Sequence, residues 1–331
     1  MEKGSTTMTQ IKDAQNVRLF ALNSNQPLAE SIAEKIGLPL SKASVNHFAD
    51  GEIKITIDES VRGCEVYVIQ SVSDPVNTNL MELLIMVDAL RRASAAKINV
   101  VMPYYGYARQ DRKARSREPI TAKLIANLLE MDQISRLVTI DLHAPQVQGF
   151  FDIPVDHLQA TSLFTKYIEE QNLGDDIVVV APDHAGVNLA RKYAERIKAS
   201  IAIIDNRNNE VREQTEQEVP EYVIGDVKGK TAIIVDDIVD TGVRMNLSAQ
   251  TLKNFGAAKV YGIATHAVLS ADAVNTLQNS PLEKMIVTDT IHLPKEKEFP
   301  KLVQLSVDDL LKEAIVRIHN NQSIDTLFNR K

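Results

Sequence analysis

The sequence predicts an α/β fold built as two halves of similar size, and three observations support this. Short apolar runs rich in β-branched residues alternate with helical patterns along most of the chain. The same alternation starts again in the second half. With 331 residues, of which 44% are hydrophobic, the chain is long enough for two buried cores. We therefore expect two domains, each with a mainly parallel sheet flanked by helices.

The first half carries four expected strands and two expected helices. The strands are expected at residues 17–22, 66–70, 98–103 and 137–141. Residues 79–93 are expected to be helical, because the apolar side chains there recur at helical spacing, at Leu80, Leu83, Leu84, Val87 and Leu90. A second helix is expected to start near Pro119, where the fixed φ of proline suits a first turn. These elements predict a first domain over residues 17–160, after a disordered polar extension of residues 1–16.

The second half repeats this pattern with five expected strands, at residues 177–183, 201–205, 231–237, 260–266 and 285–289. Residues 206–217 are polar and weakly patterned, which favours a mobile loop or a flexible hairpin. We expect a second domain over residues 161–310 and a C-terminal helix and tail over residues 311–331. Most of the strands end in an acid or a histidine, and ligands of open α/β sheets bind beyond the carboxyl ends of strands.

Composition excludes several classes of function. The net charge of −7 argues against nucleic-acid binding, which needs a broad basic surface. The sequence has no run of eighteen apolar residues, so we expect no membrane span, and residues 1–16 lack the apolar core of a signal peptide. With Cys64 as the single cysteine, no intramolecular disulfide can form, which favours a cytoplasmic setting. One basic cluster, at residues 109–117, suits either a small polyanion or a solvated loop, and both interpretations stay open.

The most informative segment is residues 231–244, TAIIVDDIVDTGVR, an apolar strand followed by acids, a turn and a helical stretch. This arrangement suits a sugar phosphate. Asp236 and Asp237 can accept hydrogen bonds from vicinal hydroxyls, while loop amides and the next helix N-terminus can hold a phosphate. Thr241 adds a hydroxyl donor, and Gly242 allows the backbone to approach an anion closely. The alternative is a capped strand-to-helix turn without a ligand.

Together with that loop, several long motifs resemble those of the ribose-phosphate diphosphokinases. They are FADGE (48–52) and the segments 79–95, 103–124, 141–158, 225–241 and 306–324, so that the similarity runs from about Val17 nearly to the end. The resemblance implies two related domains of the type I phosphoribosyltransferase fold, assembled into dimers and hexamers. It also implies transfer of the diphosphoryl group of ATP to the anomeric hydroxyl of ribose 5-phosphate.

The resemblance implies a role for particular residues. It assigns ATP binding to Phe48, Asp50, Gly51, Glu52, Arg109 and Gln110. It assigns Mg²⁺ to His143 and Asp183, although a lone histidine after a strand is more often structural. It assigns ribose 5-phosphate to Asp236, Asp237, Asp240, Thr241, Gly242, Val243 and Arg244.

The chain departs from the family pattern at positions that carry chemistry. A Lys-Arg-Arg-Pro sequence of active members is replaced by residues 206–209, Asn-Arg-Asn-Asn, which leaves Arg207 as the catalytic cation and a neutral Asn206 at the lysine position. In the sugar-phosphate loop, Val243 stands where glycine is expected and Arg244 where a hydroxyl is expected. Ala185 likewise replaces a glycine of the diphosphate-binding loop.

Two alternatives to an active enzyme stay open at this point. One is a weak or inactive paralogue that acts as a regulatory or associated subunit of an active diphosphokinase, in a hetero-oligomer instead of a homo-oligomer. The other is a phosphoribosyltransferase or a phosphoribosyl-binding regulator, which the two-domain length and the motifs for ATP make less favoured.

Overall fold

The computed structural model describes residues 11–173, 176–205 and 222–328. The chain forms two compact units. Unit 1 comprises residues up to Gln159 together with 290–292 and 306–330, and unit 2 comprises residues 160–289 and 293–305. Each unit is an α/β structure with its own sheet.

Unit 1 contains a five-stranded parallel sheet in the order β1-β4-β5-β6-β7. A separate antiparallel hairpin is formed by β2 and β3. The strands are β1 (Val17–Ala21), β2 (Ala43–His47), β3 (Ile53–Ile57), β4 (Glu65–Ile69), β5 (Lys97–Met102), β6 (Arg136–Ile140) and β7 (Val155–Leu158). The helices are α1 (Gln26–Ile36), α2 (Val76–Arg92), α3 (Thr121–Met131), α9 (Asp308–His319) and α10 (Asp325–Phe328).

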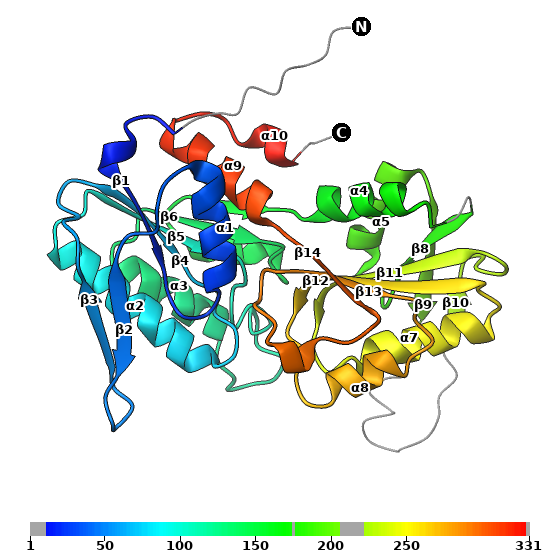
Figure 1. Cartoon of the computed structure of the whole chain (residues 1–331). Helices are drawn as coiled ribbons and strands as arrows, with labels where there is room; N and C mark the ends of the chain where they lie inside the picture. The colour runs from blue at the N-terminus through cyan, green and yellow to red at the C-terminus, as the bar shows by residue number, and fades with distance from the viewer. Residues whose placement is uncertain (1–10, 174–175, 206–221, 329–331) are drawn as a thin grey trace, which may run out of the picture. The chain divides into compact units, whose positions relative to one another are not determined.

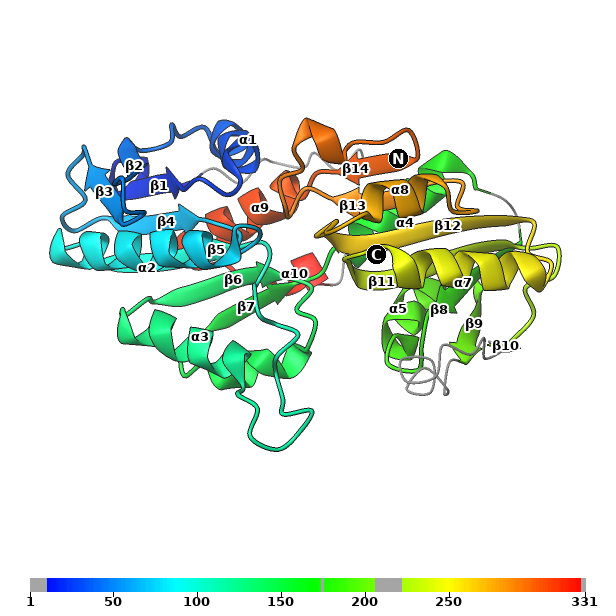
Figure 2. The same ribbon diagram turned by 90° about the horizontal axis from the view of Figure 1, so that it is seen from below.

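Helices cover both faces of this sheet, with α2 and α3 on one face and α1 and α9 on the other (Figure 2). The apolar stripe of α2, including Leu83 and Val87, packs with Val66 and Val100 from the strands in one buried cluster. Successive strand residues point to opposite faces, so the sheet is buried on both sides and its strands are continuously apolar.

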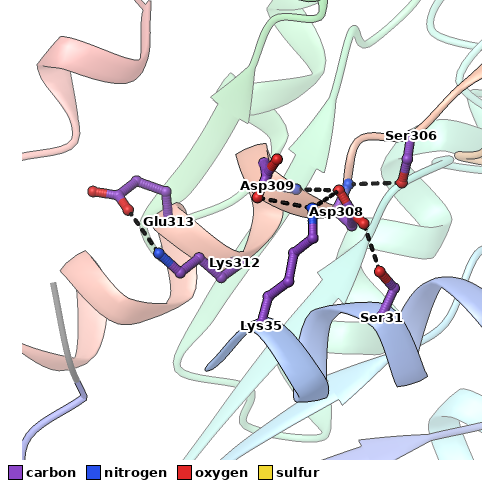
Figure 3. A network of polar contacts seen from close by, with 7 residues as sticks. All are labelled: Ser31, Lys35, Ser306, Asp308, Asp309, Lys312 and Glu313. Atoms are coloured by element: carbon purple, nitrogen blue, oxygen red, sulfur yellow. Dashed lines mark hydrogen bonds and ion pairs between the residues drawn. The ribbon is translucent and has the colours of Figure 1, made fainter. Parts of the chain in front are cut away.

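Helix α9 is attached to α1 by a polar network (Figure 3). The Asp308 carboxylate accepts hydrogen bonds from the Ser31 hydroxyl and from Lys35, whose Nζ lies 2.8 Å from Oδ1. Lys35 also pairs with Asp309 at 2.9 Å, and the Ser306 hydroxyl accepts the Asp308 N–H. Burial alone would raise the pKa of Asp308, but the hydrogen bonds from Lys35 and Ser31 outweigh it and lower that pKa below 3.8. The contacts of Asp308 with Ser31 and Lys35 join residues that are 277 and 273 positions apart in the sequence.

We expect Asp308→Asn to destabilise the protein by about 1–2 kcal/mol near neutral pH, because Lys35 loses a charged partner but is partly screened by water. A lowered carboxyl pKa stabilises the fold above pH 3.8 and stops doing so as the pH falls through the folded-state pKa. The difference between the two proteins should therefore shrink below pH 3.8. Urea unfolding at several pH values measures it.

Asp309→Asn is the matched control, since Asp309 contacts the same lysine but its side chain is 75% exposed. We expect it to lower stability much less. Equal losses from Asp308→Asn and Asp309→Asn, or a loss from Asp308→Asn that persists at low pH, would contradict this account.

Unit 2 contains a seven-stranded sheet in the order β10-β9-β8-β11-β12-β13-β14. All neighbours are parallel except β10, which is antiparallel to β9. The strands are β8 (Ile177–Ala181), β9 (Ser200–Asp205), β10 (Tyr222–Ile224), β11 (Thr231–Val239), β12 (Lys259–Ala267), β13 (Met285–Thr288) and β14 (Leu302–Leu305). The helices are α4 (Thr161–Gln171), α5 (Val187–Ile197), α7 (Val243–Asn254) and α8 (Ala273–Gln278).

Helices α4 and α5 lie on one face of this sheet and α7 and α8 on the other (Figure 1). On the α7 side, Met245 and Leu252 pack in a buried cluster with Ile234 of the central strand. On the α5 side, the rings of Phe164 and Tyr193 lie 6.2 Å apart. The central strand β11 is thus buried on both faces and carries its acids at its carboxyl end.

Several boundaries differ from the sequence-based expectation. The C-terminal helix begins at Asp308, before the expected boundary at 310/311, and is part of unit 1 through its contacts with α1. Ala14–Asn16, placed by the sequence in a disordered extension, form a 3-10 turn, and Lys12 next to it donates its N–H to Asn320 at 3.0 Å. Helix α3 begins at Thr121, two residues after Pro119.

Within the part of the chain that the structure describes, no helix combines the length and the apolar character that crossing a bilayer requires.

Candidate active site

The carboxyl edge of the unit 2 sheet brings together acids that are far apart in the sequence. Strands β8 and β11 are parallel neighbours, with Val180 opposite Ile234. Asp183, two residues after β8, and Asp236, near the end of β11, therefore lie at the same edge. The side chains of Asp183 and Asp236 are 22% and 12% exposed.

Arg244, in the first turn of α7, bridges these two acids. Its Nη1 lies 2.6 Å from Oδ2 of Asp183, and its Nη2 lies 2.7 Å from Oδ2 of Asp236. The other oxygen of each carboxylate accepts a backbone N–H, from Gly186 at 2.8 Å and from Asp237 at 3.0 Å. Both oxygens of both carboxylates are thus engaged within the chain.

The electrostatics of this cluster follow from burial and from the paired charges. Burial raises the pKa of Asp236 to about 7, Arg244 opposes that shift, and the neighbouring Asp237 adds to it. Burial would lower the pKa of the Arg244 guanidinium, but Asp236 and Asp183 outweigh burial and raise it. Arg244 therefore stays charged, and its positive charge is the largest influence that lowers the pKa of Asp236.

The turn between β11 and α7 holds the remaining predicted residues. Asp240 accepts hydrogen bonds from the hydroxyl and, at 3.1 Å, from the backbone N–H of Ser270, and Thr241 is exposed. Gly242 precedes α7 with a φ of 75°, and Val243 is the first residue of the helix, with 49% of its surface exposed. Val243, which stands where the family pattern has glycine, meets no backbone strain, because Gly242 takes the left-handed conformation and Val243 is helical.

Gly242→Ala is expected to destabilise the protein by roughly 2 kcal/mol, because an added Cβ meets both backbone strain and a close neighbour. That Cβ would lie 2.9 Å from Cγ of Leu277. Gly229 has the same φ of 75° but no atom within 4 Å, so Gly229→Ala isolates the cost of the backbone strain. Thermal unfolding of both variants measures the cost of backbone strain alone and the cost of strain plus the clash with Leu277. Equal losses of stability in the two variants would contradict the role assigned to Leu277.

In unit 1, four of the residues predicted for ATP lie in the turn between β2 and β3. The Phe48 N–H donates to the Glu52 carbonyl at 2.8 Å, and the Gly51 N–H donates to the Phe48 carbonyl at 2.9 Å. The Asp50 carboxylate accepts the Glu52 N–H at 3.1 Å, and Gly51 has a φ of 93°. The Phe48 side chain is 53% exposed. The turn is thus well fixed and presents an aromatic ring outward.

Arg109 and Gln110 follow β5 and line a cavity of about 560 Å³ in unit 1. Gln110 is fixed by the Thr121 hydroxyl, which donates to its Oε1 at 2.6 Å. The cavity is also lined by Tyr104, by Tyr107 and by the segment 74–78. Sequence reasoning missed that segment, although its Asp-Pro pair is a turn signal before a helix.

The residues predicted to bind metal are placed separately in the two units. His143 follows β6 and is exposed. Among the described residues, no group of three or more His, Cys, Asp or Glu side chains is arranged to hold a metal ion. Asp183 fits a resident Mg²⁺ poorly, because Arg244 already places a positive charge against one of its oxygens while the Gly186 N–H donates to the other.

The predicted catalytic cation Arg207 lies outside the described residues, as do Asn206 and Asn208. The predicted mobile loop or hairpin over 206–217 lies there too.

Known proteins resemble the chain along nearly its whole length. The model of the N-terminal domain of ribose phosphate pyrophosphokinase matches residues 17–132, and that of the phosphoribosyl synthetase-associated domain matches residues 204–329. Ribose-phosphate pyrophosphokinase 1 of Listeria innocua is 59% identical, over 94% of this chain and 97% of that protein. The chain belongs to the ribose-phosphate pyrophosphokinase family.

Further members of the family support the same assignment. Ribose-phosphate pyrophosphokinase of Bacillus subtilis is 55% identical, over 95% of this chain and 98% of that protein. The crystal structure of phosphoribosylpyrophosphate synthetase from Mycobacterium smegmatis superposes with a TM-score of 0.87 at 42% identity, covering 92% of this chain and 99% of that one. The fold predicted from the sequence, with helix-flanked and mainly parallel sheets, is therefore confirmed.

Proposed function

We propose that this chain is a ribose-phosphate diphosphokinase, which converts ATP and ribose 5-phosphate into AMP and 5-phosphoribosyl 1-diphosphate. The observation that carries the proposal is the end-to-end similarity to ribose-phosphate pyrophosphokinases, 59% and 55% identical over at least 94% of the chain. Both matched family models belong to this enzyme class and together cover regions of both units. The acid-rich carboxyl edge of unit 2 supports the same function.

Ribose 5-phosphate would bind at the turn between β11 and α7. Asp236 and Asp237 offer carboxylate oxygens that accept hydrogen bonds from a vicinal diol. The N-terminus of α7, with the Thr241 hydroxyl and the backbone at Gly242, offers donors to the 5-phosphate. The two carboxylates and the helix N-terminus follow one another closely in the chain, so that they can hold the two ends of one pentose phosphate.

ATP would bind in unit 1, where the cavity lined by Arg109 and Gln110 is large enough for a nucleotide. Mg²⁺ would arrive with ATP as part of the substrate, held mostly by phosphate oxygens and water. His143, which is exposed and follows β6 in the sequence, would be a protein ligand from unit 1. Phe48, half exposed in the turn between β2 and β3, would contact ATP bound to a neighbouring subunit of a homo-oligomer, as the family resemblance implies. The single cysteine, Cys64, is buried and can form no intramolecular disulfide, which is compatible with a cytoplasmic setting.

In the reaction, the anomeric hydroxyl oxygen of ribose 5-phosphate attacks the β-phosphorus of ATP. The bond from that phosphorus to the oxygen shared with the α-phosphorus breaks, AMP leaves with this oxygen, and the hydroxyl proton is released. The chain would contribute positioning and neutralisation of charge. We propose that this step is slow, because Asn206 and Asn208 are neutral at two positions where the family pattern has cations.

The test is to incubate the purified chain with magnesium, ATP and ribose 5-phosphate and to separate AMP from ADP chromatographically. We expect AMP to form in proportion to ribose 5-phosphate consumed, because the diphosphoryl group is transferred in one piece. ADP in place of AMP would indicate transfer of the γ-phosphoryl group and overturn the assignment. Failure to form AMP above a control without ribose 5-phosphate would overturn it as well.

A further inference from the structure

The guanidinium of Arg244 lies on the solvent side of two acids that it contacts directly. The Arg244 side chain is 49% exposed, whereas the side chains of Asp183 and Asp236 are 22% and 12% exposed. Each contact is an ion pair at 2.6 or 2.7 Å, within the range of charge-assisted hydrogen bonds. A cation that enters from solvent therefore meets a fixed positive charge before it meets either carboxylate.

A divalent cation and this guanidinium compete for the same oxygens. Magnesium binds through carboxylate oxygens at short range and tolerates little distortion of its octahedral geometry. At Asp183, one oxygen accepts the Gly186 N–H and the other accepts Arg244. Metal binding here requires loss of the ion pair, and the displaced arginine would still repel the metal from the first turn of α7.

The guanidinium can keep both acids and still bind an anion. It carries five N–H donors in a planar fork, and the contacts with Asp183 and Asp236 are made by its two terminal nitrogens. It belongs to the first turn of α7, whose backbone N–H groups have no partner within the helix and which follows the carboxyl end of β11 in the chain. A phosphate at this helix terminus thus finds a positive charge that is already part of the chain.

We propose that Arg244 supplies the positive charge at Asp183 and Asp236, so that unit 2 takes ribose 5-phosphate without a divalent cation on Asp183. This inference rests on the proposed function. It makes Arg244 a specificity-determining residue, which selects the free sugar phosphate over its metal complex. A threonine at position 244, as in the family pattern, removes the internal cation and frees both carboxylates.

The first experiment titrates Mn²⁺ into nucleotide-free protein and follows the free ion by electron paramagnetic resonance. We expect Arg244→Thr to gain one site that is at least about tenfold tighter than any in the wild type, since one lost ion pair of this kind is worth about that factor. Adding Asp183→Asn should abolish the gained site. Arg244→Lys, which keeps the charge, should gain none, and thermal melting checks that all variants fold.

Two results of this titration would overturn the proposal. One is a Mn²⁺ site in the wild type that disappears in Asp183→Asn, because Arg244 would then not exclude the metal. The other is no gain of a site in a folded Arg244→Thr variant, because Arg244 would then not stand where a cation can bind.

The second experiment measures ribose 5-phosphate binding by calorimetry, once with EDTA and once with Mg²⁺. The wild type should bind equally in both, whereas Arg244→Thr should bind about tenfold more weakly in EDTA and recover with Mg²⁺. Wild-type binding that appears only with Mg²⁺ overturns this inference and leaves the proposed function standing. Failure of ribose 5-phosphate to bind in every titration contradicts this inference, and the AMP assay tests the proposed function independently.

Discussion

Asn206→Lys combined with Asn208→Arg is expected to raise kcat for AMP formation roughly a hundredfold or more, the range that cations on a transferring phosphoryl group contribute. Both asparagines stand in the segment where the family pattern has Lys-Arg-Arg-Pro. A neutral amide cannot offset the charge that develops on the β-phosphoryl oxygens, whereas an ammonium and a guanidinium can. The KM values for ATP and ribose 5-phosphate should change much less than kcat, because the added charges act mainly in the transition state.

Asn209→Lys is the matched control for this prediction. It adds one positive charge to the same segment, against two in the double variant, and does so at the position where the family pattern has proline. We expect it to leave kcat nearly unchanged. If the double variant and Asn209→Lys give the same rate as the wild type, the loss of cations is not what limits this chain. If both raise kcat equally, the effect is one of general charge and not of position.

Asp236→Asn combined with Asp237→Asn is expected to lower kcat/KM for ribose 5-phosphate by about two orders of magnitude or more. An amide has nearly the shape of a carboxylate but loses two charge-assisted acceptor oxygens for the sugar diol. It also leaves Asp183 as the only charged one of the two acids that Arg244 bridges. The KM for ATP should stay close to that of the wild type, because the nucleotide residues lie in unit 1.

Asp176→Asn serves as the control, since Asp176 precedes β8 at the opposite, amino edge of the same sheet. Its side chain is 70% exposed and pairs loosely with Lys230 at 3.5 Å. We expect no change in kcat/KM for either substrate. A similar loss from Asp176→Asn would indicate that charge on unit 2 matters only in a general way, which contradicts the assignment of the diol site to Asp236 and Asp237.

Much of the fold follows from local patterns in the sequence. The buried strands β4, β5, β8 and β11 were predicted because continuous β-branched runs between helical stretches are typical of parallel sheets. The hairpin of β2 and β3 and the short strands β7, β10 and β14 were missed. Those strands are three to five residues long. In several of them buried and exposed residues alternate or the side chains are only half buried, so their sequence pattern differs little from that of a loop.

The attachment of the C-terminal helix to unit 1 could not be read from the sequence. It depends on Ser31 and Lys35 meeting Asp308, a contact between two helices at opposite ends of the chain. Nothing in the local pattern of either helix identifies its partner. In the sequence, Asp308 looks like any acid in the first turn of a helix, where a negative charge interacts favourably with the helix dipole.

The parts of the candidate site that follow from strand topology could be predicted from the sequence. The contacts that depend on side-chain geometry could not. Asp183 and Asp236 were expected at the carboxyl ends of their strands, and the parallel pairing of β8 with β11 places both at one edge. The bridge by Arg244 depends on the exact start of α7, which the positive φ of Gly242 sets. The sequence therefore indicated a substitution at position 244 but not that its guanidinium would contact both acids.

A crystal structure of the protein with ribose 5-phosphate tests the central claim most directly. Our account predicts the sugar at the carboxyl edge of unit 2, with its diol on Asp236 and Asp237 and its 5-phosphate at the N-terminus of α7, where Thr241 and Gly242 lie. Ribose 5-phosphate bound elsewhere, with the ion pairs between Arg244 and its two acids undisturbed and this edge empty at saturating concentration, would contradict it.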